Sequence, residues 1–221
     1  MPNDTFICNC WTSKDWDNST YEFPFCTSWY RKIQTVRKVE RWLLPSIKSR
    51  TWHCQPLKET HFEELQFFSN DEEYFKGIDH YFDYFSNSTT KKFEKSATYF
   101  TDLKTPKRLK FFLPRAKVIA LLLEPAERAY SWYQHQVAHN DPAAISNSFY
   151  EILTSQSSDG DRWRLKMRCL QPGHYSEHLK RWFKYFDATN VITVDGNLLK
   201  SDPIKVMNKL QIDLGLQLGY S

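Results

Sequence analysis

The feature that most constrains this chain is the stretch from 116 to 139, AKVIALLLEPAERAYSWYQHQVAH, where an apolar run passes directly into a helical pattern. The run KVIALLL is typical of a buried strand, and Pro125 stands where a helix can begin. Polar residues then recur within one arc of roughly 80° of the expected helix. They are Arg128, Ser131, His135 and His139. Ala126, Ala129, Tyr130, Tyr133 and Val137 share another face, which is predicted to pack.

The place of this helix, directly after a buried strand, favours anion binding. In open α/β sheets, unpaired N–H groups and the helix dipole point toward a ligand at the carboxyl ends of the strands. An arginine and a serine in the first turns suit a phosphate group. A solvated helix face that carries two histidines remains an open alternative.

Helix and strand patterns alternate from residue 58 onward. Strands are expected at 93–96, 117–123 and 190–194, and helices at 71–85, 106–112, 128–139, 148–154, 162–170, 175–186 and from 203 to near 215. Strands that alternate with helices predict a parallel sheet covered by helices, in one α/β domain. The two strands at 117–123 and 190–194 are expected to be parallel neighbours or near-neighbours.

The first 57 residues differ from the rest, because they are irregular and rich in tryptophan. They contain a basic amphipathic helical pattern at 29–44, and they have too little β-character to supply a central strand. The net charge is only +4, but basic residues gather at 31–50 and 104–117. Such clusters suit a polyanion, although each is also compatible with ordinary solubility. No nucleic-acid-reading motif accompanies them, so nucleic acid is not an expected partner.

Signals of cellular location and of metal binding are mixed. No run reaches the length of a membrane span and the N-terminus lacks the order of a signal peptide, so no membrane contact by this chain itself is expected. N-glycosylation acceptor triplets at Asn3, Asn18 and Asn87 matter only in a secretory lumen. The 5 cysteines lack paired spacing, so free thiols are expected. The alternative is a zinc site built from Cys8, Cys10, Cys26 and either His53 or Cys54.

Two further segments carry groups suited to catalysis. In THFEELQFF, Glu63 and Glu64 precede an aromatic cluster that could desolvate a carboxylate and raise its proton affinity. In FEKSATYF, Lys95 follows a short β-run, where an ammonium could meet a sulfated or phosphorylated group. Exposed side chains that serve only solubility are the alternative for both segments.

Taken in order, these segments resemble the sulfotransferase domain of the bifunctional heparan sulfate N-deacetylase/N-sulfotransferases. The similar text is ETHFEELQFF, YFKGIDHYFDYF, FEKSATYF, FFLPRAKVIALL, EPAERAYSWYQHQVAHNDP, RCLQPGHYSEHLKRW and NVITVDGNLL. The resemblance implies a P-loop-like α/β fold, incomplete at both ends. It also implies transfer of a sulfuryl group from 3′-phosphoadenylyl sulfate (PAPS) to the glucosamine nitrogen of heparan sulfate or N-deacetylated heparosan, in the Golgi lumen.

The resemblance assigns roles to residues on the acceptor side. Glu64 matches the family's catalytic base, which would take a proton from the acceptor amine. His135 and His139 match two histidines of the active-site cleft, the first with a catalytic role and the second with a role in substrate binding. Lys95 matches a lysine that lines the acceptor groove.

On the donor side, Ser131 matches the serine that binds the 3′-phosphate of PAPS. Many relatives place an arginine eight residues before that serine, where this chain has Leu123, so Arg128 becomes the nearest guanidinium. The chemistry of sulfuryl transfer needs cationic clamps, in-line positioning and a base, and this arrangement requires no metal.

The chain departs from the family pattern in its first part. The family holds the 5′-phosphosulfate in a Lys-Thr-Gly-Thr-Thr loop, whereas this chain has no glycine before Gly77. We therefore expect a divergent segment at 1–57, a partial sulfotransferase domain at 58–215 and a tail at 216–221. On this view the chain is an impaired fragment without the deacetylase half, the membrane anchor or the family's closing basic loop. The alternative is a non-catalytic, glycosaminoglycan-binding pseudoenzyme.

Overall fold

The computed structural model describes residues 5–9, 64–85 and 92–216, which fall into two units. The first unit comprises 5–9, 64–85, 92–122 and 180–216, and the second comprises 123–179. The predicted helix at 29–44, the three glycosylation triplets and the zinc alternative built on Cys10 and Cys26 lie outside the described residues. No helix among the described residues is both long enough and apolar enough to cross a membrane.

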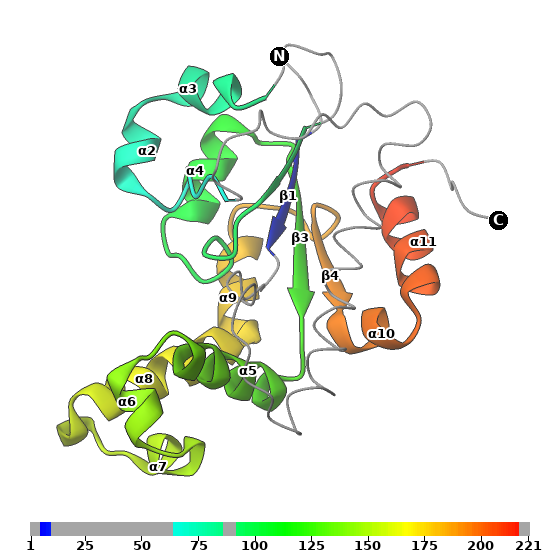
Figure 1. Cartoon of the computed structure of the whole chain (residues 1–221). Helices are drawn as coiled ribbons and strands as arrows, with labels where there is room; N and C mark the ends of the chain where they lie inside the picture. Colours follow the sequence, from blue (N-terminus) through cyan, green and yellow to red (C-terminus); the bar gives the residue numbers. More distant parts are fainter. Residues whose placement is uncertain (1–4, 10–63, 86–91, 217–221) are drawn as a thin grey trace. The chain divides into compact units, whose positions relative to one another are not determined.

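The first unit is built on a parallel sheet with the strand order β2-β1-β3-β4 (Figure 1). The strands are β1 (Thr5–Asn9), β2 (Lys92–Lys95), β3 (Lys117–Leu122) and β4 (Val191–Asp195). Val118 of β3 lies opposite Val191 of β4 in parallel register. The predicted parallel pairing of these two strands is therefore confirmed.

The expectation that the first 57 residues cannot supply a central strand is wrong. The strand β1 lies between β2 and β3, with Thr5 opposite Lys92 and Phe6 opposite Lys117. The segment TFICN is short, but both of its edges form backbone ladders with long-range partners, and such pairing outweighs weak local propensity. The residues that follow β1, from 10 to 63, lie outside the described part of the chain.

The helical pattern at 71–85 forms two short helices rather than the one predicted. They are α2 (Asp71–Phe75) and α3 (Ile78–Asp83). Gly77 separates them with a φ of 90°, a left-handed conformation that glycine adopts at no steric cost. The Asn70 side chain accepts a hydrogen bond from Glu72 N–H and so caps the start of α2.

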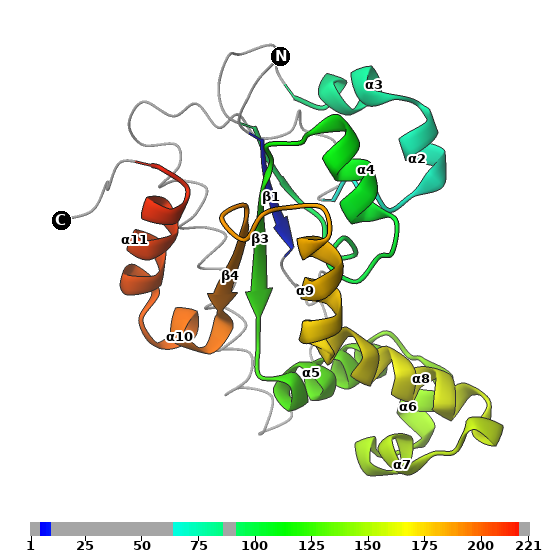
Figure 2. The same cartoon turned by 180° about the vertical axis from the view of Figure 1, so that it is seen from behind.

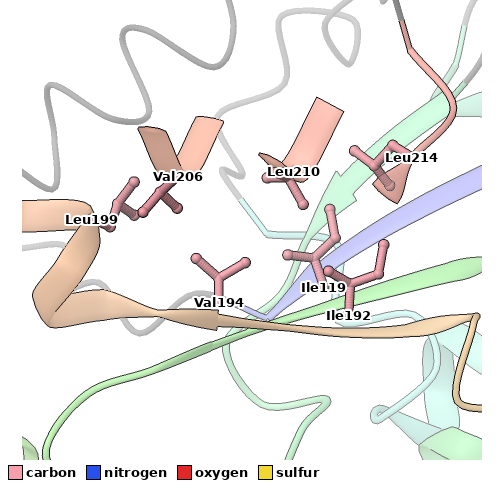
Figure 3. Packing of buried hydrophobic residues seen from close by; sticks show 7 residues of the cluster. All are labelled: Ile119, Ile192, Val194, Leu199, Val206, Leu210 and Leu214. Atoms are coloured by element: carbon pink, nitrogen blue, oxygen red, sulfur yellow. The ribbon is translucent and has the colours of Figure 1, made fainter. Parts of the chain in front are cut away.

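Helices cover both faces of the sheet, as the sequence predicts. On one face, α10 (Gly196–Ser201) and α11 (Pro203–Asp213) pack against β3 and β4 (Figure 3). Their shared core consists of Ile119, Ile192, Val194, Leu199, Val206, Leu210 and Leu214. The helix α4 (Thr105–Phe112) lies on the other side of the strands from α11 (Figures 1 and 2). Burial of each side chain in the core shared by α10, α11, β3 and β4 stabilises the fold by about 1.5–3 kcal/mol relative to leaving it exposed.

The second unit is helical. Its elements are α5 (Pro125–Ala138), α6 (Pro142–Ser146), α7 (Phe149–Thr154), α8 (Asp161–Leu170), two short 3-10 turns (Ser157–Asp159 and Gln171–Gly173) and the start of α9 (Tyr175–Phe183). The helices predicted at 128–139, 148–154, 162–170 and 175–186 are present with boundaries shifted by up to three residues, whereas α6 and the two 3-10 turns were not predicted. Tyr133, Ile152, Leu165 and Cys169 are among its buried core residues. Burial raises the pKa of the Cys169 thiol to about 11, as expected of an unreactive free cysteine.

Candidate functional site

The structure brings Glu64 and Lys95 together in the first unit. Lys95 Nζ lies 3.5 Å from Glu64 Oε1, and the side chains of Lys95 and Glu64 are only 15% and 7% exposed. The N–H of Ala97 donates to Glu64 Oε2 at 3.2 Å. Both oxygens of the predicted base therefore have a partner in the segment that begins at the end of β2.

A strained turn follows Glu64 directly. Gln66 has a φ of 50°, in the left-handed region that non-glycine residues rarely adopt. Its N–H donates to Ser96 Oγ at 3.1 Å, and its carbonyl accepts from Asn70 N–H at 2.9 Å. The turn leads from the largely buried Glu64 to Phe67 and Phe68, which are both fully buried.

A second carboxyl lies beside this turn, and sequence reasoning did not identify it. Glu94, on β2, is 1% exposed and accepts hydrogen bonds from Tyr81 at 2.9 Å, Ser96 at 2.9 Å and Tyr99 at 2.5 Å. Burial raises the pKa of Glu94 from an ordinary 4.5 to about 7, although the three hydroxyl donors oppose this rise.

The aromatic cluster that follows Glu64 in the sequence also packs beside Glu94. The ring of Tyr81 lies 5.0 Å from that of Phe67 and 5.1 Å from that of Phe68, and Tyr81 donates directly to Glu94. One feature of the sequence could have pointed to a buried Glu94. The segment FEKSATYF is rich in hydroxyl-bearing residues, which can hydrogen-bond to a buried carboxylate.

The predicted polar arc of the second unit lies along α5. Ser131 and His135 are half-buried, and His139 is exposed at the helix C-cap. The centroids of the two imidazole rings are 4.2 Å apart, and the His135 ring stacks on Trp132 at 5.0 Å. Helical spacing has therefore placed the two histidines in direct ring contact.

Arg128 is placed differently from a solvent-facing phosphate donor. Its side chain is 2% exposed, its guanidinium donates to the carbonyl of Cys169, and burial lowers its pKa. A Cβ added at Gly173 would lie 3.6 Å from Arg128 Nε, an ordinary van der Waals distance, so the packing here does not require glycine.

The predicted packing face of α5 is correct only in part. Ala129 and Tyr133 are buried as expected, but Ala126 and Tyr130 are exposed. Arg128 and Gln136 are buried in their place. Polar residues can occupy such positions when they are hydrogen-bonded, and Gln136 Oε1 accepts from Arg168 at 2.8 Å.

The basic cluster at 104–117 is partly engaged within the protein. Arg108 pairs with Asp71, donates to the carbonyl of Phe68 at 3.2 Å and lies over the Tyr74 ring. Lys104 also pairs with Asp71, at 2.7 Å. Lys107 is exposed. In the part of the chain that the structure describes, no three His, Cys, Asp or Glu side chains form a group suited to a metal ion.

Comparison with known proteins gives a consistent result. Residues 26–219 match the model of the sulfotransferase domain family. The chain is 47% identical over 166 residues to bifunctional heparan sulfate N-deacetylase/N-sulfotransferase 1 of Homo sapiens, covering 73% of this chain and 19% of that protein. It is 49% identical over 160 residues to bifunctional heparan sulfate N-deacetylase/N-sulfotransferase 2 of Bos taurus, covering 70% of this chain and 18% of that protein.

The fold also has a solved counterpart. The structure resembles the crystal structure of a sulfotransferase from Alicyclobacillus acidocaldarius, with a TM-score of 0.61 and 22% identity over 100% of this chain and 83% of the other. At this identity the likeness concerns the fold alone. The family match covers most of the chain, and the predicted sheet with its helices agrees with it. The chain belongs to the sulfotransferase domain family.

Proposed function

We propose that this chain binds PAPS and a heparan sulfate chain, and that it transfers the sulfuryl group to a glucosamine nitrogen. The observation that carries the proposal is the contact of Glu64 with Lys95 at 3.5 Å, which pairs a carboxylate with an ammonium where the acceptor is expected. The names of the relatives indicate the same reaction, although the chain spans less than a fifth of the length of those relatives.

In the proposed reaction, one bond forms, one bond breaks and one proton is removed. The acceptor nitrogen forms a bond to sulfur while the bond from sulfur to the bridging oxygen of PAPS breaks, and adenosine 3′,5′-bisphosphate leaves. Glu64 takes the proton that the amine loses. Lys95 and His139 bind the acid groups of the sugar chain, and His135 stabilises charge that develops on the transferring group.

The donor is assigned to α5. Ser131, half-buried in the second turn, donates to the 3′-phosphate. Arg128 lies one turn earlier, and an adjacent phosphate would offset part of the cost of burying its guanidinium. We place the protein in the Golgi lumen, where the acceptor triplets at Asn3, Asn18 and Asn87 would carry glycans.

A second candidate is binding without turnover. It is favoured by the lack of any glycine before Gly77, because a loop that wraps a phosphosulfate closely needs glycine's backbone freedom. We therefore expect transfer to be slower than in a domain that carries the lysine-glycine loop. The loss of one preorganised donor to the transferring group costs roughly 100- to 1,000-fold in rate.

Radiolabelled donor incubated with N-deacetylated heparan sulfate tests the two candidates. Incorporation that Glu64→Gln abolishes supports the enzyme. Retention of the polymer together with no incorporation above a heat-denatured sample supports the binding module. The absence of both retention and incorporation would refute the two proposals together.

A further inference from the structure

We propose that Glu94 and Ser96 position the Glu64 carboxylate, because together they form a buried hydrogen-bonded bridge between the end of β2 and the segment that carries Glu64. Both act through Glu64, so they are positioning residues. The proposal rests on the proposed role of Glu64 as the base, and it explains how that group is held.

The bridge has a defined direction. The Ser96 hydroxyl donates to Glu94 Oε1 at 2.9 Å and accepts from the N–H of Gln66 at 3.1 Å. A hydroxyl has one proton, and Ser96 directs it at Glu94 Oε1, so a lone pair on the hydroxyl oxygen is left for the backbone donor. Ser96 is 0% exposed and Glu94 is 1% exposed, so water does not compete for these bonds.

Glu94 reaches the same segment by a second route. The Tyr99 hydroxyl donates a hydrogen bond to Glu94 Oε1, and the Tyr99 hydroxyl oxygen accepts one from the N–H of Phe68 at 3.2 Å. Two backbone N–H groups, those of Gln66 and Phe68, are thus connected to one buried carboxyl through one hydroxyl each. This arrangement holds the strained backbone at Gln66, where φ is 50°.

The bridge sets the surroundings of Glu64 because its two ends flank the base. Gln66 follows Glu64 by two residues, and Ser96 stands between the two residues that contact the carboxylate, Lys95 and Ala97. If the two segments separated, Glu64 Oε2 would lose the N–H of Ala97. Small displacements of a catalytic group are costly, since a shift of about 1 Å can lower the rate 100-fold.

Amide hydrogen exchange of the full-length chain tests the bridge without requiring turnover. Ser96→Ala should accelerate exchange at the amides of Gln66 and Ala97 at least tenfold, and Ser96→Thr should restore both rates. Glu94→Gln keeps one oxygen acceptor and should give a smaller rise. The amide of Val118, which donates to Asn190 in the sheet at 2.7 Å, reports opening of the whole unit and should not change.

Ser69→Ala is the matched control. The Ser69 and Thr98 hydroxyls lie 2.9 Å apart and join the same two segments at the surface, without Glu94. Ser69→Ala should change the exchange rate at the amide of Ala97 by less than twofold. Two results for Ser96→Ala would overturn the proposal. One is faster exchange at Gln66 with an unchanged rate at Ala97, and the other is acceleration at Val118 by the same factor as at Gln66.

A kinetic measurement then connects the bridge to the reaction. Ser96→Ala should lower kcat about tenfold, with the acceptor KM within twofold, and Ser96→Thr should recover kcat. Unchanged turnover in Ser96→Ala would refute the positioning role. Failure of the proposed function is seen separately, as sulfate incorporation that Glu64→Gln does not reduce, and it leaves the exchange result intact.

Discussion

The candidate residues of the first unit and those of the second unit are held by different kinds of interaction. Glu64 is held by partners more than 30 positions away in the sequence, including the N–H of Ala97. The α5 residues Ser131, His135 and His139 owe their alignment to the period of one helix. Long-range hydrogen bonds between buried groups tolerate little change, whereas a helix keeps its alignment when one surface side chain is replaced. We therefore expect a change at Glu64 to reduce activity sharply and a change at Ser131 to weaken donor binding gradually.

The largest effect is expected at the base. Glu64→Gln should lower sulfate incorporation by about 100- to 10,000-fold, since the amide cannot accept the proton of the amine. Binding of adenosine 3′,5′-bisphosphate, measured by calorimetry, should not change. Glu73→Gln is the control, because the Glu73 carboxylate pairs with Lys76 and His80 and accepts from the Tyr84 hydroxyl. Equal loss in both variants would show that Glu64 has no special role in the reaction.

The pH dependence of stability tests the burial of Glu94. The folded protein keeps this proton up to about pH 7, whereas the unfolded chain releases it near 4.5, so the folded state binds more protons between these values. The wild-type free energy of unfolding should therefore fall, relative to that of Glu94→Gln, by up to about 3 kcal/mol as pH rises from 4.5 through 7. Urea titrations at pH 5 and pH 8 measure the difference. Parallel pH profiles would show that Glu94 is not buried as described.

A smaller effect is expected on donor binding. Ser131→Ala should raise the Kd of adenosine 3′,5′-bisphosphate roughly 10- to 100-fold, because a hydrogen bond to a charged group contributes about 1.5–3 kcal/mol. Ser157→Ala, an exposed serine of the same unit, is the matched control. Calorimetry gives both constants. A Kd within twofold of the wild type for Ser131→Ala would contradict the proposal that Ser131 of α5 binds the donor.

The smallest effect concerns the basic surface of α4. Lys107→Ala should lower the salt concentration at which the protein elutes from heparin, by a step equivalent to less than about 1 kcal/mol, since exposed charges are screened. Arg108→Ala should instead lower thermal stability, because it removes contacts with Asp71 and the Phe68 carbonyl. Lys205→Ala, on an exposed position of α11, is the control. Elution that is unchanged by Lys107→Ala would exclude this helix from polymer binding.

Local patterns predicted much of this fold. The apolar runs at 117–123 and 190–194 form β3 and β4 in parallel, and the helical period after Pro125 forms α5. The N-terminal strand was missed, because TFICN becomes a strand only when β2 and β3 supply its hydrogen bonds. The helix predicted at 71–85 is interrupted because Gly77 adopts a backbone conformation that periodicity does not report.

The sequence by itself determined the family, the parallel sheet and the alignment of the residues on α5, since these depend on motifs and on helical or strand periods. Only the tertiary structure decided that Glu94 is fully buried. In KFEK, Glu94 is buried and Phe93 is only half-buried, although charged side chains are usually the exposed ones. The reason is that Tyr81, Ser96 and Tyr99 bring three hydroxyl donors to one point, and this compensation for burying a carboxyl group exists only after the chain has folded.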